Sequence, residues 1–219
     1  MKNLVIIGAG GSAKEILWLI DDLNDQACEI NFLGFVDPLA PGRTGNLCDR
    51  PILGGWDDVP SGNVYFVCAI GSPHARKKEC LEAESRGWRP LTLIHPTAII
   101  SKFSSIGEGT AVAARAVVGP DSKIGRHSTL NFGAFVGHDA SVGAFCVLSP
   151  NACVLGHALL EDGVFMGASS TINVRCKMGP GSRLGASSFL MASLPGGASA
   201  IGVPARQFYS APKTQPPPG

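Results

Sequence analysis

The stretch LNFGAFVGHDASVGAFCVLS, residues 130–149, repeats one pattern every six residues. Each hexapeptide opens with an aliphatic residue, and these are Leu130, Val136, Val142 and Leu148. The fifth residue of each hexapeptide is small, as at Ala134, Ala140 and Cys146. A period of six fits neither the α-helix, with about 3.6 residues per turn, nor the β-strand, whose side chains alternate. The stretch therefore indicates a repeat architecture of another kind.

The same repeat extends in both directions along the chain. Consecutive sixth positions are all aliphatic or Met: Ile94, Ile100, Ile106, Val112, Val118, Ile124, Leu130, Val136, Val142, Leu148, Val154, Leu160, Met166, Ile172, Met178, Leu184 and Leu190. From Ala98 to Ser188 the fifth residue of each hexapeptide is Ala, Ser, Thr or Cys, apart from Val164. A coil of three flat faces, with one hexapeptide per face, turns one aliphatic residue of each face inward. Glycine, frequent after the aliphatic residue, is expected to supply the dihedrals of tight corners. The repeat predicts roughly five to six coils whose backbones pair into three parallel sheets.

The residues before the repeat have a different rhythm. Apolar runs at residues 4–8, 32–36, 65–70 and 91–94 predict strands, and helical spacing predicts helices over residues 12–24 and 73–86. Residues 38–62, rich in Gly and Pro, are expected to form a loop. The alternation of strands and helices predicts a small parallel sheet. We therefore expect a short Rossmann-like α/β domain over residues 1–92, the repeat domain over 93–209 and a Pro-rich disordered tail over 210–219.

Composition excludes several classes of protein. Lys and Arg together number 18 against 17 Asp and Glu, so the chain has no basic field that would attract nucleic acid or a membrane surface. No apolar run reaches the roughly 18 residues of a membrane span, and the N-terminal apolar run is too short for a signal peptide. We expect a cytoplasmic protein. The seven cysteines form no C-x-x-C pair, and no His-x4-His pair exists, so neither disulfides nor a metal site is predicted.

One ionisable pair, His138 and Asp139, interrupts the small and aliphatic residues of the repeat. These are the third and fourth residues of a hexapeptide, and both positions turn outward at a corner. A neutral imidazole is the usual general base at neutral pH, and a neighbouring carboxylate can orient it. The alternative interpretation is a pair of ordinary surface residues. His157, one coil beyond Asp139, either lines the same cleft or is an exposed surface histidine.

The run from Gly8 to Ala13, Gly-Ala-Gly-Gly-Ser-Ala, lies between a predicted strand and a predicted helix. It fits the pattern G-x-G-x-x-A, and Asp37 ends the next predicted strand, as in dinucleotide-binding folds. The predicted sheet has too few strands for a full dinucleotide fold. A turn that only packs a strand on a helix is the other interpretation from the residues themselves.

The chain as a whole resembles the bacterial hexapeptide-repeat sugar acyltransferases. The resemblance rests on the Gly-rich N-terminal domain, the linker Leu93-Ile-His-Pro96, the repeats, and the closing segment Gly202-Val-Pro-Ala-Arg206. This family includes nucleotide-aminosugar N-acetyltransferases of the bacillosamine and perosamine pathways and sialic acid O-acetyltransferases. The resemblance implies a left-handed parallel β-helix, acetyl-CoA as cosubstrate, and a homotrimer whose active sites lie between adjacent β-helices.

The resemblance also implies roles for particular residues. The motif Val136-Gly-His-Asp139 makes His138 the general base and Asp139 its partner, and Asn131 would lie near the acceptor sugar. Relatives often have a polar residue or histidine nine residues after the base, where this chain has Val147. The residues expected to bind the nucleotide sugar are Gly10, Gly11, Ser12, Asp37, Gly71 and Ser72, with a diphosphate at the helix N-terminus. Those expected to line the coenzyme A groove are Gly156, Ala168 and Ala186. The Gly156 N–H is the expected oxyanion donor.

The expected function is an acetyl-CoA-dependent N-acetyltransferase that acts on the amino group of a nucleotide-linked amino sugar, with direct attack of that amine on the thioester. A sialic acid O-acetyltransferase would use the same base on a hydroxyl group. A non-catalytic β-helix protein that binds nucleotide sugars is the alternative from another class. It would bind no coenzyme A, whereas both enzymes require it.

Overall fold

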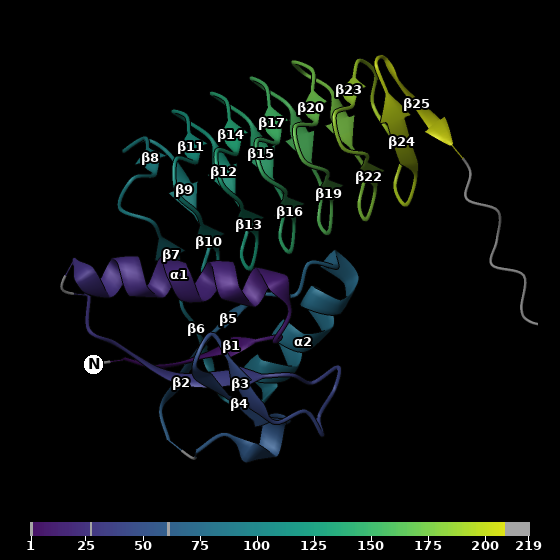
Figure 1. Cartoon of the computed structure of the whole chain (residues 1–219). Helices are drawn as coiled ribbons and strands as arrows, with labels where there is room; N and C mark the ends of the chain where they lie inside the picture. Colours follow the sequence, from purple (N-terminus) through teal and green to yellow (C-terminus); the bar gives the residue numbers. More distant parts are fainter. Residues whose placement is uncertain (1, 27, 61, 209–219) are drawn as a thin grey trace, which may run out of the picture.

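The computed structural model describes residues 2–26, 28–60 and 62–208. An α/β part precedes a stack of coils, and α1 lies along the lower edge of that stack (Figure 1). The architecture changes between β6 (Arg89–Pro90) and β7 (Leu93–Ile94), because β6 pairs with the α/β sheet and β7 with the coils. Neither α-helix in the described part of the chain could cross a lipid bilayer.

The α/β part is a six-stranded sheet with the strand order β3-β4-β2-β1-β5-β6. Its other strands are β1 (Lys2–Ile7), β2 (Ile30–Val36), β3 (Gly45–Leu47), β4 (Arg50–Gly54) and β5 (Val64–Cys68). All neighbours are parallel except β3 and β4. Helix α1 (Gly11–Asp25) shares a buried cluster with Leu4 and Ile6, whereas α2 (Pro73–Ser85) shares one with Val5 and Ile7. Because side chains alternate along β1, the two helices cover opposite faces of the sheet.

Two expectations about this part were wrong. Residues 38–62 are not all loop, since they contain β3, β4 and a 3-10 helix at Trp56–Asp58. These are short elements at the sheet edge, and Pro51 and Gly54 in β4 weaken any strand pattern in the sequence. The strand predicted at 91–94 is shorter and lies elsewhere. Only Leu93–Ile94 is a strand, and it belongs to the coils and not to the α/β sheet. The predicted tail at 210–219 lies outside the described residues.

The coils form a parallel β-helix with three faces, and its strands, apart from those of the closing hairpin, are two residues long. The first face contains β7, β10 (Ala111–Val112), β13 (Thr129–Leu130), β16 (Val147–Leu148), β19 (Phe165–Met166), β22 (Arg183–Leu184) and β24 (Ser199–Gly202). The second face contains β8 (Ile99–Ile100), β11 (Val117–Val118), β14 (Phe135–Val136), β17 (Cys153–Val154), β20 (Thr171–Ile172) and β23 (Phe189–Leu190). The third face contains β9 (Ser105–Ile106), β12 (Lys123–Ile124), β15 (Ser141–Val142), β18 (Leu159–Leu160) and β21 (Lys177–Met178). Strand β25 (Ala205–Phe208) pairs antiparallel with β24 at the end of the first face.

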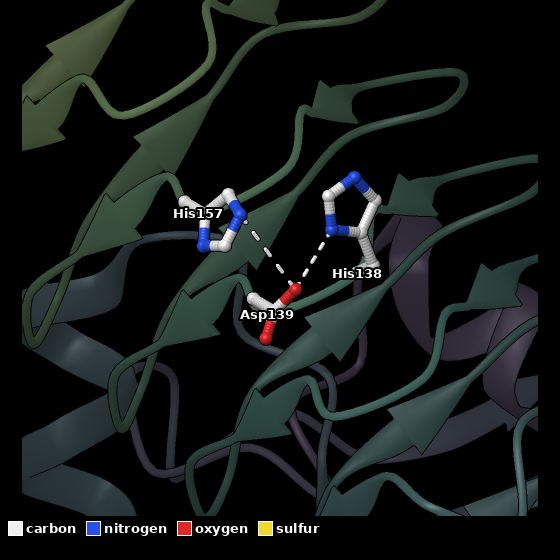
Figure 2. Close-up of side chains that lie close together, drawn as sticks. All are labelled: His138, Asp139 and His157. Carbon is white, nitrogen blue, oxygen red and sulfur yellow. Dashed lines mark hydrogen bonds and ion pairs between the residues drawn. The ribbon is translucent and has the colours of Figure 1, made fainter.

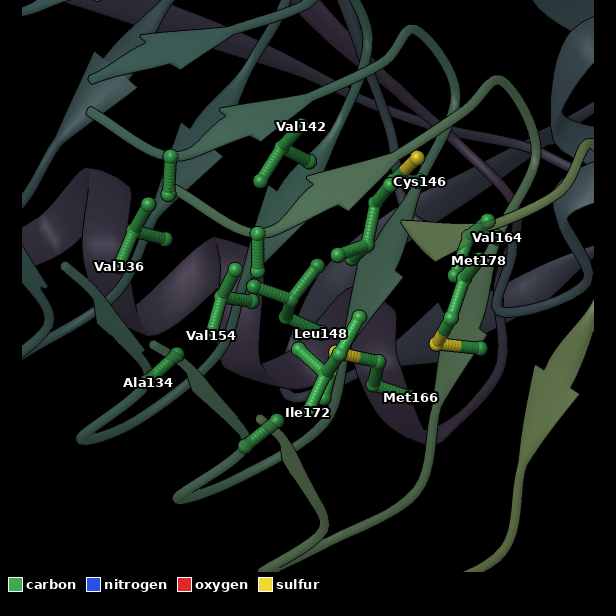
Figure 3. Packing of buried hydrophobic residues seen from close by; sticks show 14 of the residues in the cluster. Ala134, Val136, Val142, Cys146, Leu148, Val154, Val164, Met166, Ile172 and Met178 are labelled. Atoms are coloured by element: carbon green, nitrogen blue, oxygen red, sulfur yellow. The ribbon is translucent and has the colours of Figure 1, made fainter. Parts of the chain in front are cut away.

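The predicted inward positions form the core of the β-helix. Side chains such as Val136, Leu148 and Met166 are fully buried and point toward one another inside the coils (Figure 3). Most residues of the fifth position are buried with them, and several of their hydroxyl groups find local partners, although that of Ser182 has none among the described residues. For example, Ser122 and Ser170 each donate a hydrogen bond of 2.7 Å to the carbonyl three residues earlier. This part of the prediction is confirmed, and each large buried side chain contributes roughly 1.5–3 kcal/mol.

Glycine supplies the corner dihedrals at some coils, as expected, but at the fourth position of the hexapeptide. The backbone is left-handed there, with φ of 64° at Gly133 and 69° at Gly163, and side-chain-bearing residues such as Asp139 and His157 also adopt it, with φ of 58°. The frequent glycine at the second position has no such dihedral. A Cβ on Gly137 would lie 3.0 Å from the backbone nitrogen of Gly156 on the next coil. At Gly125 the approach to the carbonyl carbon of Gly143 is closer still, so these particular positions require glycine. Other second positions, such as Asn131 and Leu155, carry side chains.

The α/β part packs on the β-helix through a buried histidine. The His127 ring lies between those of Phe66 and Phe145, at centroid distances of 5.5 and 5.4 Å. Its Nε2 lies 2.9 Å from Glu84 Oε1 of α2, while the buried Nδ1 has no hydrogen-bond partner among the described residues. The buried Arg76 of α2 donates a hydrogen bond to the His127 carbonyl. These contacts join α2 to a corner of the coils.

Burial lowers the pKa of His127 below its ordinary value of 6.5, although the hydrogen bond with Glu84 opposes that shift. Burial alone would raise the pKa of Glu84, but its hydrogen bonds from His127 and Arg126 outweigh this and lower it. In both cases the unfolded chain binds protons more readily than the folded one. The stability that these groups contribute is therefore present above their unfolded pKa values and lost as pH falls, first for His127 below about 6.5 and then for Glu84.

We predict that His127→Gln reduces the loss of stability between neutral pH and about pH 5.5, because glutamine can donate to Glu84 but does not titrate. Chemical denaturation at a series of pH values measures this. The matched control is His74→Gln, since His74 is exposed on α2. Equal pH dependence in wild type and the His127 variant would contradict the prediction.

Candidate functional site

His138 lies at the corner that follows β14, between the second and third faces of the β-helix. Its Nδ1 is 2.8 Å from Asp139 Oδ2 (Figure 2). The hydrogen bond from His138 lowers the pKa of Asp139, and the nearby charge of His157 adds to this effect. An ionised carboxylate only accepts hydrogen bonds, so Nδ1 carries the proton and donates it. The other ring nitrogen, Nε2, is left with a free lone pair.

The free nitrogen of His138 faces the next coil. A Cβ on Gly156 would lie 2.6 Å from His138 Nε2, so the imidazole rests over the position that this glycine leaves empty. The Gly156 N–H donates no backbone hydrogen bond within the described part of the chain. The His138 side chain is 60% exposed, so a substrate can reach it from solvent.

His157 shares the carboxylate of Asp139 with His138. Its Nε2 is 3.7 Å from Asp139 Oδ2, and its ring stands edge-on to that of His138 with centroids 5.2 Å apart (Figure 2). His157 thus lies beside the His-Asp pair while its side chain is 43% exposed, so the structure does not decide between the two interpretations of this residue. The sequence signal for this neighbourhood is that His157 follows Asp139 by one full coil. Backbone hydrogen bonds between coils, here from the His157 N–H to the His138 carbonyl, stack residues with this spacing.

The three residues expected to line a coenzyme A groove do not lie on one corner. Gly156 stacks directly on His138, whereas Ala168 and Ala186 stack on each other at the corner between the first and second faces. The two corners border opposite edges of the second face. Within one chain the three residues therefore do not form a continuous groove.

Asn131 faces the α/β part. Its Nδ2 donates a hydrogen bond of 3.1 Å to Glu15 Oε2 on α1, and its Oδ1 accepts one from the Phe132 N–H. Ser12 and Gly71 line the same small cavity, which lies between α1, the end of β5 and the first face. The structure thus places Asn131 beside the predicted nucleotide-sugar residues. It shows no contact between Asn131 and His138 among the described residues.

The other predicted substrate residues lie at the carboxyl edge of the parallel sheet, where ligands of such sheets bind. Gly10 caps α1 and Gly11 begins it, and a Cβ on either residue would meet nothing within 4 Å. Ser72 caps α2 directly after Gly71. The glycine loop is therefore accessible to a ligand.

Asp37 at this edge already has a partner. The residue is only 7% exposed, and Arg43 lies 3.3 Å from its Oδ2 while donating a second hydrogen bond to the Ala9 carbonyl. Arg43 could not be predicted from the sequence, because nothing in its loop indicates that the chain folds back onto the glycine run. The arginine ties Asp37 to the loop that precedes α1.

Parts of the chain are similar in sequence to known proteins. Residues 3–81 match the family described as the PglD N-terminal domain. UDP-N-acetylbacillosamine N-acetyltransferase of Bacillus subtilis (strain 168) is 33% identical over 120 residues, which are 52% of each chain. The match therefore spans about half the length of this curated relative.

Two solved structures align over nearly the whole chain. A histidine-to-asparagine mutant of perosamine N-acetyltransferase from Caulobacter crescentus, in complex with CoA and GDP-perosamine, is 30% identical. The alignment covers 96% of this chain and 98% of that one, with a TM-score of 0.86. The acetyltransferase domain of PglB from Neisseria gonorrhoeae is 26% identical over 95% and 100% of the two chains, with a TM-score of 0.85. Both the repeat and the α/β part are shared with these proteins, and the chain belongs to the family of hexapeptide-repeat bacterial sugar acetyltransferases.

Proposed function

We propose that this protein transfers the acetyl group of acetyl-CoA to the amino group of a nucleotide-linked amino sugar. The observation that carries the proposal is the His138–Asp139 pair, whose exposed imidazole keeps a free Nε2 beside Gly156. The relative from Caulobacter crescentus, in complex with CoA and GDP-perosamine, supports both substrates. Because acetyl-CoA is supplied inside the cell, we place the reaction in the cytoplasm.

In the proposed mechanism the neutral amine attacks the thioester carbonyl while His138 Nε2 accepts its proton. Asp139, bonded to Nδ1, stabilises the imidazolium that forms. The Gly156 N–H donates to the tetrahedral oxyanion. The carbon–sulfur bond then breaks, and the imidazolium returns the proton to the coenzyme A thiolate. General base catalysis of this type contributes about 10^2 to 10^4 in rate, and holding both substrates side by side contributes further.

The nucleotide is proposed to bind at the glycine loop of the α/β part. The N–H groups of Gly10, Gly11 and Ser12 lie at the start of α1, where a helix favours a diphosphate. Gly71 and Ser72 border the same edge of the sheet, and Asn131 would face the sugar. Asp37 would contact the ribose or base. Its ion pair with Arg43 would either open on binding or form part of the same contact.

The second face of the β-helix supports a homotrimer. Its outward residues form a largely apolar stripe: Ile99, Val117, Phe135, Cys153, Thr171 and Phe189. Ile99 is 65% exposed and Phe135 38%. Contiguous apolar surface of this kind usually marks an interaction site. Packing this face against another copy would bring the His138 corner of one chain toward the Ala168 corner of the next. The proposed coenzyme A groove would then lie between chains.

We predict that His138→Asn lowers kcat by about 10^2 to 10^4 and changes KM much less, because the base acts in the transition state. The measurement is release of free thiol from acetyl-CoA with a panel of 4-amino nucleotide sugars. His74→Asn, on the exposed side of α2, is the control. A His138 variant that retains most of its turnover would remove this residue from the mechanism.

Calorimetry with coenzyme A, and then with UDP, GDP and CMP, tests the class of substrate. We expect binding of coenzyme A and of UDP or GDP. Binding of CMP in their place would favour the sialic acid O-acetyltransferase, and absence of coenzyme A binding would favour the non-catalytic nucleotide-sugar protein.

Gly156→Ala should reduce kcat by at least about tenfold, because its Cβ would displace the His138 ring that rests over this position. Gly42→Ala is the matched control, since a Cβ on Gly42 meets nothing within 4 Å. Circular dichroism and thermal unfolding verify that both variants fold. Unchanged turnover in a folded Gly156 variant would show that the position of the ring is not critical.

Phe135→Glu should shift the protein from trimer to smaller species in sedimentation velocity, since it places a charge in the proposed interface. Leu159→Glu is a closely matched control on the third face, where Leu159 is 37% exposed. A monomeric wild-type protein, or equal effects of the two variants, would refute the role of the second face.

A further inference from the structure

A group of three possible metal ligands lies at the corner of the His-Asp pair. One donor atom from each of His138, Asp139 and His157 lies within 4.8 Å of the other two. We propose that these residues form a binding site for Zn²⁺ and that the bound ion inhibits the enzyme. The binding half of the proposal stands on the geometry, whereas the inhibitory half rests on the proposed function of His138.

The spacing of the donor atoms is close to that of a zinc site. In a tetrahedral site with bonds of about 2.0–2.1 Å, the ligand atoms lie roughly 3.3–3.5 Å from one another. Here Asp139 Oδ2 is 2.8 Å from His138 Nδ1 and 3.7 Å from His157 Nε2. The two imidazole donors lie within 4.8 Å of each other. Rotation of the three side chains would bring all three donor atoms to the spacing of a tetrahedral site.

The backbone positions of the three ligands are held by hydrogen bonds that do not involve their side chains. The Asp139 N–H donates to the Pro120 carbonyl, and the His157 N–H donates to the His138 carbonyl. These hydrogen bonds join three successive coils of the β-helix. The main chain that carries the ligands is therefore already ordered before an ion arrives, which reduces the entropic cost of binding it.

The donor set selects the class of metal. Two imidazoles and one carboxylate suit Zn²⁺ and similar transition metals, whereas Mg²⁺ and Ca²⁺ prefer oxygen ligands alone. Three protein ligands leave a fourth position for water. All three side chains are exposed, so an ion can enter directly from solvent.

Zinc would inhibit by changing which nitrogen of His138 carries the proton. Without metal, Nδ1–H donates to Asp139 and Nε2 is the free base. Zinc takes the lone pair of Nδ1, so the proton leaves Nδ1 and Nε2 gains one through solvent. The neutral ring then donates from Nε2 and accepts no proton from the amine. The ion is thus no resident cofactor, because the metal-free form is the active one.

Titration of the full-length protein with Co²⁺, followed by visible absorption, tests the site directly, and Zn²⁺ should displace the Co²⁺. We expect one ion per chain and ligand-field bands without a thiolate charge-transfer band. His157→Gln and Asp139→Asn should each weaken binding at least about 10- to 100-fold. His74→Gln, which removes an exposed histidine elsewhere, should leave it unchanged.

Two results would overturn the site. One is the absence of ligand-field bands in the wild-type protein. The other is binding that survives in His157→Gln or shows a thiolate band, because the ion would then be held elsewhere, as by the exposed Cys28 or Cys48.

Inhibition is measured as loss of thioester absorbance, since zinc also binds the free thiol of coenzyme A. Zinc should slow the wild-type enzyme, and a chelator should restore the rate. His157→Gln should require at least about tenfold more zinc for the same fractional inhibition of its own metal-free rate. Localised zinc binding without loss of rate would overturn the inhibitory half. Failure of the metal-free protein to acetylate any acceptor would refute the proposed function, while the cobalt titration would still decide the site.

Discussion

The close approach of successive coils is the constraint on which the β-helix depends. Backbone hydrogen bonds hold equivalent residues of neighbouring coils at strand spacing, as Val136 pairs with Val154 and Phe135 with Cys153. At the second position of the hexapeptide the coils come so near that a Cβ on Gly137 would lie 3.0 Å from the nitrogen of Gly156. Equivalent residues therefore stack in columns, and each coil contributes one residue to a column. The residues of a site in this fold come from one such column and from the column beside it.

The site follows from that stacking. Gly156 occupies the column of His138 and leaves room for the imidazole, while His157 occupies the column of Asp139 and shares its carboxylate. None of these residues needs a loop or a long-range fold to meet the others. A rigid scaffold of this kind positions a base well, but it also leaves that base open on one side. If a second copy packed against the apolar second face, it would cover this open side of the base.

The sequence predicted the β-helix well because every coil meets the same packing problem. The inward aliphatic residues and the small fifth residues recur with the period of the core that they fill, so Leu148 or Cys146 could be placed from spacing alone. The column that joins Asp139 to His157 follows from the same period. The His138–Asp139 pair was found because charged residues stand out against so regular a background.

The remaining features depend on contacts that have no period. Arg43 reaches back to Asp37, Asn131 reaches across to Glu15, and His127 lies between two phenylalanines from different parts of the chain. Each pair or trio is distant in sequence and follows no repeat, so no pattern connects its members. The edge strands β3 and β4 were missed for a related reason, since short strands with Gly and Pro have little signal of their own.

The antiparallel hairpin of β24 and β25 has a consequence for how the protein behaves in a crowded cell. A parallel stack of coils would otherwise present an open strand edge, onto which another β-helix could add in the same direction. Strand β25 runs the opposite way and pairs with β24 along all four of its residues. It also carries the polar side chains of Arg206 and Gln207. The hairpin thus covers the C-terminal edge of the first face with a strand of opposite direction, whereas β23 and β21 are the end strands of the other two faces. Growth of the first sheet by addition of another parallel strand is therefore blocked at this end.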